Sequence, residues 1–179
     1  MCWVKHQKLT SGCLILGMLL LLKGIRIQNL KDVIIGHLNI NSLRYKFHAL
    51  VDLIQGNLDI LVVGETKLDD TFPEQQFKIK GYKKPYRLDR NGNGGGVIIY
   101  VRDDIPSQQL KKHNLPKSVE AIFIEINLRK SKFLLIGTYR PSGEGARRDI
   151  SPSLWACGFL QSLSSPIYGN HVHFTQFWS

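Results

Sequence analysis

Apolar runs of strand length recur through the middle of the chain, each rich in β-branched residues and each ended by polar residues. Such runs are typical of buried β-strands. The pattern predicts five strands, at residues 32–38, 59–64, 97–102, 119–127 and 132–139. The fourth strand alternates in polarity, so one of its faces is expected to be apolar. A short basic turn separates it from the fifth strand, which predicts a β-hairpin.

A helix is predicted between the first two strands. Its apolar positions follow the i, i+3, i+4, i+7 spacing of one helical face; they are Phe47, Leu50, Val51 and Ile54. We expect the helix over residues 43–55, ended by Gly56 and Asn57. The β-α-β order predicts parallel neighbouring strands joined by a crossover helix. The fold class is therefore mixed α/β, with the five strands in one mixed sheet and a flanking helix.

The two ends of the chain differ from its middle. Residues 1–30 form a leader with a short apolar stretch at 13–22. The stretch has the length of a signal-peptide core, but no small-residue cleavage site follows it, and a membrane span needs about 20 residues. We therefore expect an unrelated leader and an intracellular protein, nuclear or cytoplasmic, rather than a signal, a membrane anchor or a membrane-bound protein. Residues 143–179 show no period and are expected to be an unrelated, poorly ordered tail. The domain then spans residues 31–142.

Composition and charge narrow the function classes. The 179 residues, 43% of them hydrophobic, suit one globular domain rather than a disordered or fibrous chain. The formal net charge of +10 favours a polyanionic partner such as nucleic acid, although a solvated basic surface without a specific partner is the open alternative. The three cysteines, Cys2, Cys13 and Cys157, are not at metal-ligand spacing, so neither a disulfide framework nor a zinc site is expected.

Polar residues follow two of the predicted buried strands. Asn39 ends the first strand and Glu65 the second. Ligands bind beyond the carboxyl ends of strands in α/β sheets, and amide and carboxylate oxygens suit Mg²⁺. The alternatives are a turn-forming asparagine and a helix-capping glutamate. Tyr139 ends the last predicted strand, and its hydroxyl is able to donate to a phosphate oxygen, with simple packing as the alternative.

Four sequence words carry a resemblance to a known family. They are His-Leu-Asn-Ile-Asn-Ser-Leu-Arg at 37–44, Gly-Glu-Thr-Lys-Leu at 64–68, Pro-Tyr-Arg-Leu-Asp-Arg-Asn-Gly-Asn-Gly-Gly-Gly-Val at 85–97 and Gly-Thr-Tyr-Arg-Pro at 137–141. In this order they resemble the apurinic-endonuclease-like domain of non-LTR, LINE-type retrotransposons, within the endonuclease/exonuclease/phosphatase superfamily. The resemblance covers residues 33–142 and reaches neither end of the chain.

The resemblance implies a four-layer α/β sandwich, in which two facing sheets carry helices outside and hold the active site between them at one end. It also implies phosphodiester hydrolysis with Mg²⁺ or Mn²⁺, and DNA as the substrate that the retrotransposon branch nicks. Asn39 and Glu65 match the family's metal-binding positions, and Tyr139 matches its phosphate-contacting tyrosine. Asn41 stands where relatives often have an acidic residue near the metal.

The basic and glycine-rich positions within these words are candidates for nucleic-acid contact. We expect Arg90 and Arg140 to contact the nucleic acid. Gly94 to Gly96 either let the backbone approach DNA or permit positive φ, and the structural interpretation is favoured.

The second half of the family's active site is missing from the sequence. Its Gly-Asp-Phe/Leu-Asn word, which supplies the catalytic base, and its Ser-Asp-His word do not occur in these 179 residues. We therefore expect a truncated half of the sandwich, derived from a retrotransposon, in which DNA nicking is lost. One alternative is an active phosphodiesterase completed by another chain. A second alternative is a non-catalytic, basic nucleic-acid-binding remnant.

Overall fold

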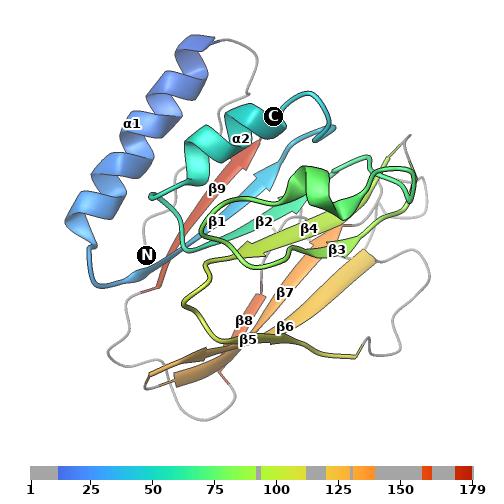
Figure 1. Cartoon of the computed structure of the whole chain (residues 1–179). Helices are drawn as coiled ribbons and strands as arrows, with labels where there is room; N and C mark the ends of the chain where they lie inside the picture. The colour runs from blue at the N-terminus through green and yellow to red at the C-terminus, as the bar shows by residue number, and fades with distance from the viewer. Residues whose placement is uncertain are drawn as a thin grey trace, which may run out of the picture.

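Two facing β-sheets form the centre of the computed structural model, and helices cover the outer face of the first sheet (Figure 1). The structure describes residues 12–91, 94–111, 120–129, 131–139, 159–162 and 172–178. The first sheet has the order β3-β4-β2-β1-β9, and the second has the order β5-β6-β7-β8. The α/β class and its mixed sheet with a flanking helix are thereby confirmed.

The first sheet consists of β1 (Val33–Asn39), β2 (Ile60–Gly64), β3 (Tyr86–Leu88), β4 (Val97–Val101) and β9 (Val172–Trp178). The second consists of β5 (Ser107–Gln109), β6 (Glu120–Leu128), β7 (Ser131–Tyr139) and β8 (Phe159–Ser162). The helices are α1 (Gly12–Gln28), α2 (Phe47–Ile54) and the 3₁₀ turn η1 (Glu74–Phe77). The predicted parallel pairing of β1 with β2 and the β6–β7 hairpin are confirmed.

The prediction of a single sheet is wrong for the β6–β7 hairpin. Its apolar face packs against β2 and β4 from the opposite side to the helices, in one buried cluster that includes Val62, Ile99 and Ile124. Contact is so close at Gly137 of β7 that an added Cβ would lie 2.7 Å from Ile99 Cδ1. The hairpin pairs with β5 and β8, so its hydrogen bonds complete a second sheet rather than extend the first.

Helix α2 is shorter than predicted, because residues 40–46 form a loop in place of its first turn. Ser42 has a φ of 84°, and its N–H donates to the carbonyl of Glu65 at 2.8 Å. The N–H of Leu43 donates likewise to Thr66 at 2.9 Å. These bonds hold the segment against the loop after β2, so the helix begins only at Phe47.

Helix α1 lies within the region predicted to be an unrelated leader, and it packs on the helical side of the first sheet beside α2 (Figure 1). Met18 and Leu22 are buried in the same cluster as Leu50 of α2 and Ile34 of β1. No helix in the described part of the chain is both long and apolar enough to cross a membrane.

Strands β8 and β9 come from the segment predicted to be a poorly ordered tail, and each joins the edge of one sheet. The boundaries at residues 30 and 142 stay predictions. Strands β3 and β5 were not predicted, because they are short and their residues are half-buried or exposed rather than apolar and buried.

Candidate metal and phosphate site

Asn39 and Glu65 lie next to each other at the carboxyl ends of β1 and β2. Asn39 pairs in register with Gly64, the residue before Glu65. The N–H of Ile40 donates to the Gly64 carbonyl at 3.1 Å, which continues the ladder one residue further. Asn39 shares its strand face with Ile35, which belongs to the cluster between the sheets, because side chains alternate along a strand. The pairing therefore places both residues at one edge of the sheet, with Asn39 on the face toward the intersheet space.

Tyr139 reaches the same place from the second sheet. It ends β7 on the face that also carries Phe133 and Leu135, both buried between the sheets. Burial raises the pKa of the Tyr139 hydroxyl, and the negative charges of Glu65 and Glu120 raise it further, as does a hydrogen bond to the Glu65 side chain. The phenol is therefore a neutral donor at physiological pH. The structure thus brings Tyr139 and Glu65 together, as the sequence predicted.

The two loops at this end of β1 and β2 hold an unusual backbone conformation. In the described segments, four residues other than glycine have positive φ: Asn41 at 45°, Ser42 at 84°, Glu65 at 55° and Lys67 at 52°. Each costs roughly 1–2 kcal/mol, and such conformations gather at functional sites. All four lie in the loops directly after β1 and β2, at the candidate ligands Asn39 and Glu65. The backbone is therefore strained at this end of the sheet.

Asn41 is exposed, and its backbone N–H donates to Asn39 Oδ1 at 3.2 Å. This hydrogen bond orients the side-chain amide of Asn39. Lys46 holds the same loop, since its Nζ donates to the carbonyls of Ile40 at 2.5 Å and Asn41 at 3.2 Å. Burial lowers the Lys46 pKa, the charge of Lys67 lowers it further, and Glu65 opposes the shift. Two ammonium groups therefore lie within electrostatic reach of the candidate site.

Glu120 is a residue of this site that the sequence reasoning missed. It pairs with Tyr139 across the β6–β7 hairpin. Its carboxylate accepts the Gly96 N–H at 2.6 Å and forms an ion pair with Arg90 at 3.4 Å. A signal was present: Glu120 falls on the same alternating face as Ile122 and Ile124, so a charge was placed on the apolar side of a strand.

The remaining sequence candidates have mixed outcomes. The Arg90 side chain is 43% exposed and is paired with Glu120, so its contact with nucleic acid stays a prediction. Gly95 and Gly96 have φ of 77° and 86°, as the structural interpretation of the glycine run expects. Arg140 lies outside the described residues.

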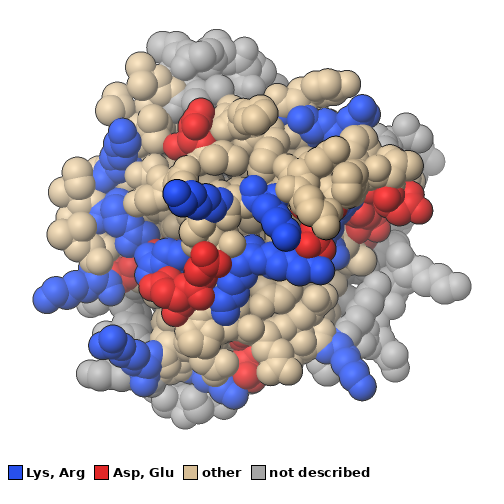
Figure 2. All heavy atoms as spheres, viewed as in Figure 1, with Lys and Arg blue, Asp and Glu red and all other residues tan. Residues whose placement is uncertain are grey.

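Basic side chains are spread over the face of the molecule in Figure 2, with acidic side chains among them. The net charge of +10 is therefore not gathered into one stripe on this face. It favours a polyanion in general, through phosphate neutralisation, without marking a single binding surface. The position of a specific nucleic-acid contact therefore has to be inferred from the candidate site and not from the charge distribution.

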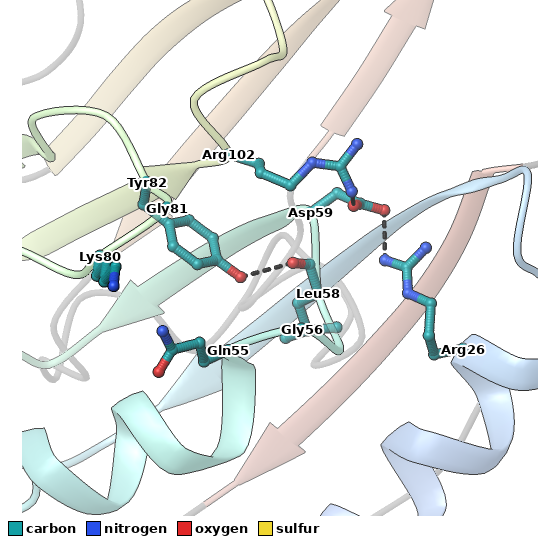
Figure 3. A pocket seen from close by; sticks show the side chains of 9 residues that line it. All are labelled: Arg26, Gln55, Gly56, Leu58, Asp59, Lys80, Gly81, Tyr82 and Arg102. Atoms are coloured by element: carbon teal, nitrogen blue, oxygen red, sulfur yellow. Dashed lines mark hydrogen bonds and ion pairs between the residues drawn. The ribbon is translucent and has the colours of Figure 1, made fainter.

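A cavity of about 330 Å³ lies at the other end of β2 and is separate from this site. In Figure 3 the guanidinium groups of Arg26 and Arg102 point at the Asp59 carboxylate, and Tyr82 points at the Leu58 carbonyl. Asp59 precedes β2, whereas Glu65 follows it. Asp59 is paired with both Arg26 and Arg102, so this end serves to join α1, β2 and β4.

The donor set at the carboxyl ends fits a hard divalent cation. No group of three His, Cys, Asp or Glu side chains with metal-site geometry occurs within the described segments. Mg²⁺ does not need one, since it commonly takes one or two protein oxygens and keeps several waters. The Asn39 amide oxygen and the Glu65 carboxylate are such donors on neighbouring strands. They would hold the ion, with Tyr139 beside it.

Comparisons with known proteins return structural likeness only. No protein-family model matches the chain, and no curated protein matches it. Among solved structures, the 3′–5′ exonuclease NExo from Neisseria meningitidis is similar, at 24% identity and a TM-score of 0.39. A 3′ phosphatase NExo variant from Neisseria bound to product DNA hairpin gives 24% and 0.38. Each match covers 56% of this chain and 39% of the other, so this chain spans well under half of either protein.

Proposed function

We propose that residues 31–142 are the first half of a metal-dependent phosphodiesterase domain of the LINE-type endonuclease kind. The observation that supports this most is the pairing of Tyr139 with Glu65, next to Asn39, at one end of the intersheet space. The three residues come from three strands in two sheets. The three sequence words that contain these residues lie far apart along the chain, so their meeting is not a consequence of local sequence.

In this proposal the chain binds one Mg²⁺ or Mn²⁺ and the phosphate backbone of duplex DNA. Asn39 and Glu65 hold the ion, which would supply Lewis-acid stabilisation of phosphoryl oxygens. Tyr139 donates its hydroxyl to a phosphate oxygen, and its raised pKa keeps that proton in place. Lys46 and Lys67 add positive potential close to Glu65. In this proposal Asn39 and Glu65 bind the metal ion, Tyr139 binds the phosphate, and the two lysines attract the phosphate backbone.

We further propose that nicking is lost in this chain and that the chain derives from a retrotransposon. Hydrolysis needs a base to deprotonate the attacking water. The words that supply that base and a catalytic histidine in the family are absent from the 179 residues. Removing single members of such a unit commonly costs several orders of magnitude in rate. DNA binding without turnover is the expected behaviour.

A paired assay tests the proposal. Fluorescence anisotropy with a labelled duplex should give salt-dependent affinity that Mg²⁺ strengthens and that Glu65→Gln weakens. Supercoiled plasmid with Mg²⁺ or Mn²⁺ should stay uncut. Glu125→Gln is the matched control, because Glu125 is paired with Lys132 at 2.9 Å, away from the site, and its replacement should change nothing. Affinity that ignores both Mg²⁺ and Glu65→Gln would contradict the proposal.

The net charge favours a second candidate, a basic nucleic-acid binder that uses no metal. It predicts affinity with the same steep salt dependence, which Mg²⁺ weakens as a competing counterion rather than strengthens. The same assay therefore separates the two. Robust nicking that Glu65→Gln abolishes would instead support an active phosphodiesterase.

A further inference from the structure

A chain of hydrogen bonds connects the second sheet to the loop that carries Glu65. It starts at the Glu120 carboxylate, which accepts the Gly96 N–H at 2.6 Å. The Gly96 carbonyl in turn accepts the Thr66 N–H at 3.3 Å, and the Gly95 carbonyl accepts the Lys67 N–H at 3.0 Å. Both amides belong to residues directly after Glu65. The position of the Glu65 loop is therefore tied to a carboxylate on the opposite sheet.

The Glu65 loop needs an external restraint because its own backbone conformation is unfavourable. Glu65 and Lys67 have φ of 55° and 52°, in the left-handed region that side chains disfavour. Such conformations persist only when the surrounding structure fixes them. The two bonds from Gly95 and Gly96 are restraints of this kind, and they act on both sides of Thr66.

Gly95 and Gly96 lie so close to their neighbours that neither position has room for a side chain. A Cβ at Gly95 would lie 2.8 Å from both Glu120 carboxylate oxygens and 2.8 Å from Arg90 Cδ. A Cβ at Gly96 would overlap Thr66 Oγ1. The Glu120 side chain is only 12% exposed, and its ion pair with Arg90 holds it from the other side. The carboxylate is thus enclosed between backbone and guanidinium.

We infer that Glu120 is a positioning residue that sets the geometry of Glu65 for its ligand, acting through the backbone of Gly95 and Gly96. The inference deepens the proposed function and rests on it only for the identity of the ligand, a divalent cation. Charge-assisted hydrogen bonds are the stronger ones, so loss of the carboxylate should release the loop measurably. The bonds within β2 itself should not change.

Amide hydrogen exchange of the full chain, followed by NMR, tests the inference without any metal. In Glu120→Ala the Thr66 and Lys67 amides should exchange roughly tenfold faster or more, while amides at the centre of β2 keep their rates. Glu120→Gln keeps an acceptor oxygen for the Gly96 N–H and should restore most of the protection. Glu125→Ala, on the same strand, is the control. Wild-type exchange of both amides in a folded Glu120→Ala chain would overturn the inference.

A second variant covers the case in which Glu120→Ala does not fold. Gly95→Ala displaces the carboxylate without removing it, and the same two amides should lose protection. Unchanged exchange in Gly95→Ala would then overturn the inference.

Binding of Mn²⁺ supplies the second readout, measured as the loss of the free-ion EPR signal. If the wild type binds Mn²⁺, the dissociation constant should rise roughly tenfold in Glu120→Ala and less in Glu120→Gln. Equal affinity in Glu120→Ala and the wild type would contradict positioning of Glu65. A wild type that binds no Mn²⁺ refutes the proposed function instead, and the exchange experiment still decides the role of Glu120.

Discussion

The Tyr139 hydroxyl lies close enough to the Glu65 carboxylate for that carboxylate to raise its pKa, and the two residues meet at the end where β1, β2 and β7 all finish. Neither residue is near the other in sequence. Their proximity depends on the packing of the β6–β7 hairpin against β2 and β4. A substitution that shifts the β6–β7 hairpin should therefore also change the surroundings of the Glu65 carboxylate.

The Tyr139 hydroxyl should matter for phosphate rather than for the fold. Because burial and the charges of Glu65 and Glu120 raise its pKa, Tyr139 remains a donor through neutral and mildly alkaline pH. Tyr139→Phe should weaken duplex DNA binding roughly three- to tenfold in anisotropy. The exposed Tyr45 provides the control, and Tyr45→Phe should bind as the wild type does. Equal affinities for both variants would refute the phosphate contact.

The packing between the sheets can be tested at Gly137. Its missing Cβ would meet Ile99 Cδ1 at 2.7 Å and Val62 Cγ1 at 3.0 Å, so Gly137→Ala overfills the intersheet core. We expect a loss of about 1–3 kcal/mol in the free energy of unfolding, measured by denaturant titration. Gly64→Ala is the matched control, since nothing lies within 4 Å of its added Cβ. Similar stability for the two variants would contradict the observed contact between the sheets.

The ion pairs at Asp59 should make a large contribution to stability. Its side chain is 1% exposed and is paired with Arg26 at 2.6 Å and with Arg102. Asp59→Asn leaves Arg26 without its charge partner and Arg102 with Asp104 alone, and should cost about 3–5 kcal/mol. Glu74→Gln removes an exposed pair with Lys84 and should cost under about 1 kcal/mol. Thermal or urea unfolding measures both, and a neutral Asp59→Asn would show that α1 does not dock through this pair.

His37 should make the fold sensitive to acid. Burial lowers its pKa from 6.5 to about 4, so the folded chain binds a proton more weakly than the unfolded chain. The stability contribution is complete above pH 6.5 and is lost as the pH falls toward 4, by up to about 1.4 kcal/mol per pH unit. His37→Gln should flatten this slope in denaturation experiments between pH 7 and 4. His48→Gln, at an exposed position on α2, should retain it, and a parallel slope in both variants would count against His37.

Local pattern predicted the elements whose apolar residues are continuous in sequence. Strands β1, β2, β4, β6 and β7 were found within a residue or two, as was the parallel pairing of β1 with β2. The start of α2 was not predicted, because Ser42 and Leu43 bond to the loop after β2 rather than continue a helix. That contact is tertiary and leaves no periodic signal.

The residues of the site were likewise predicted only where they leave a local sequence pattern. Asn39, Glu65 and Tyr139 could be chosen because each ends an apolar strand. Glu120 was missed because its role comes from a bond to the backbone of Gly96, directly before β4 of the other sheet. The division of the strands into two sheets was not predicted either, because the apolar face of a hairpin does not show which sheet it packs against.

Binding of Mn²⁺ to the wild type and to Glu65→Gln, followed by EPR, tests the central claim most directly. Glutamine keeps the size of Glu65 and an acceptor for Tyr139 but loses the anionic ligand. We predict one Mn²⁺ bound per chain and at least roughly tenfold weaker binding in Glu65→Gln, with Glu125→Gln unchanged. No saturable binding by the wild type, or equal affinity in Glu65→Gln, would contradict a metal site at the ends of β1 and β2.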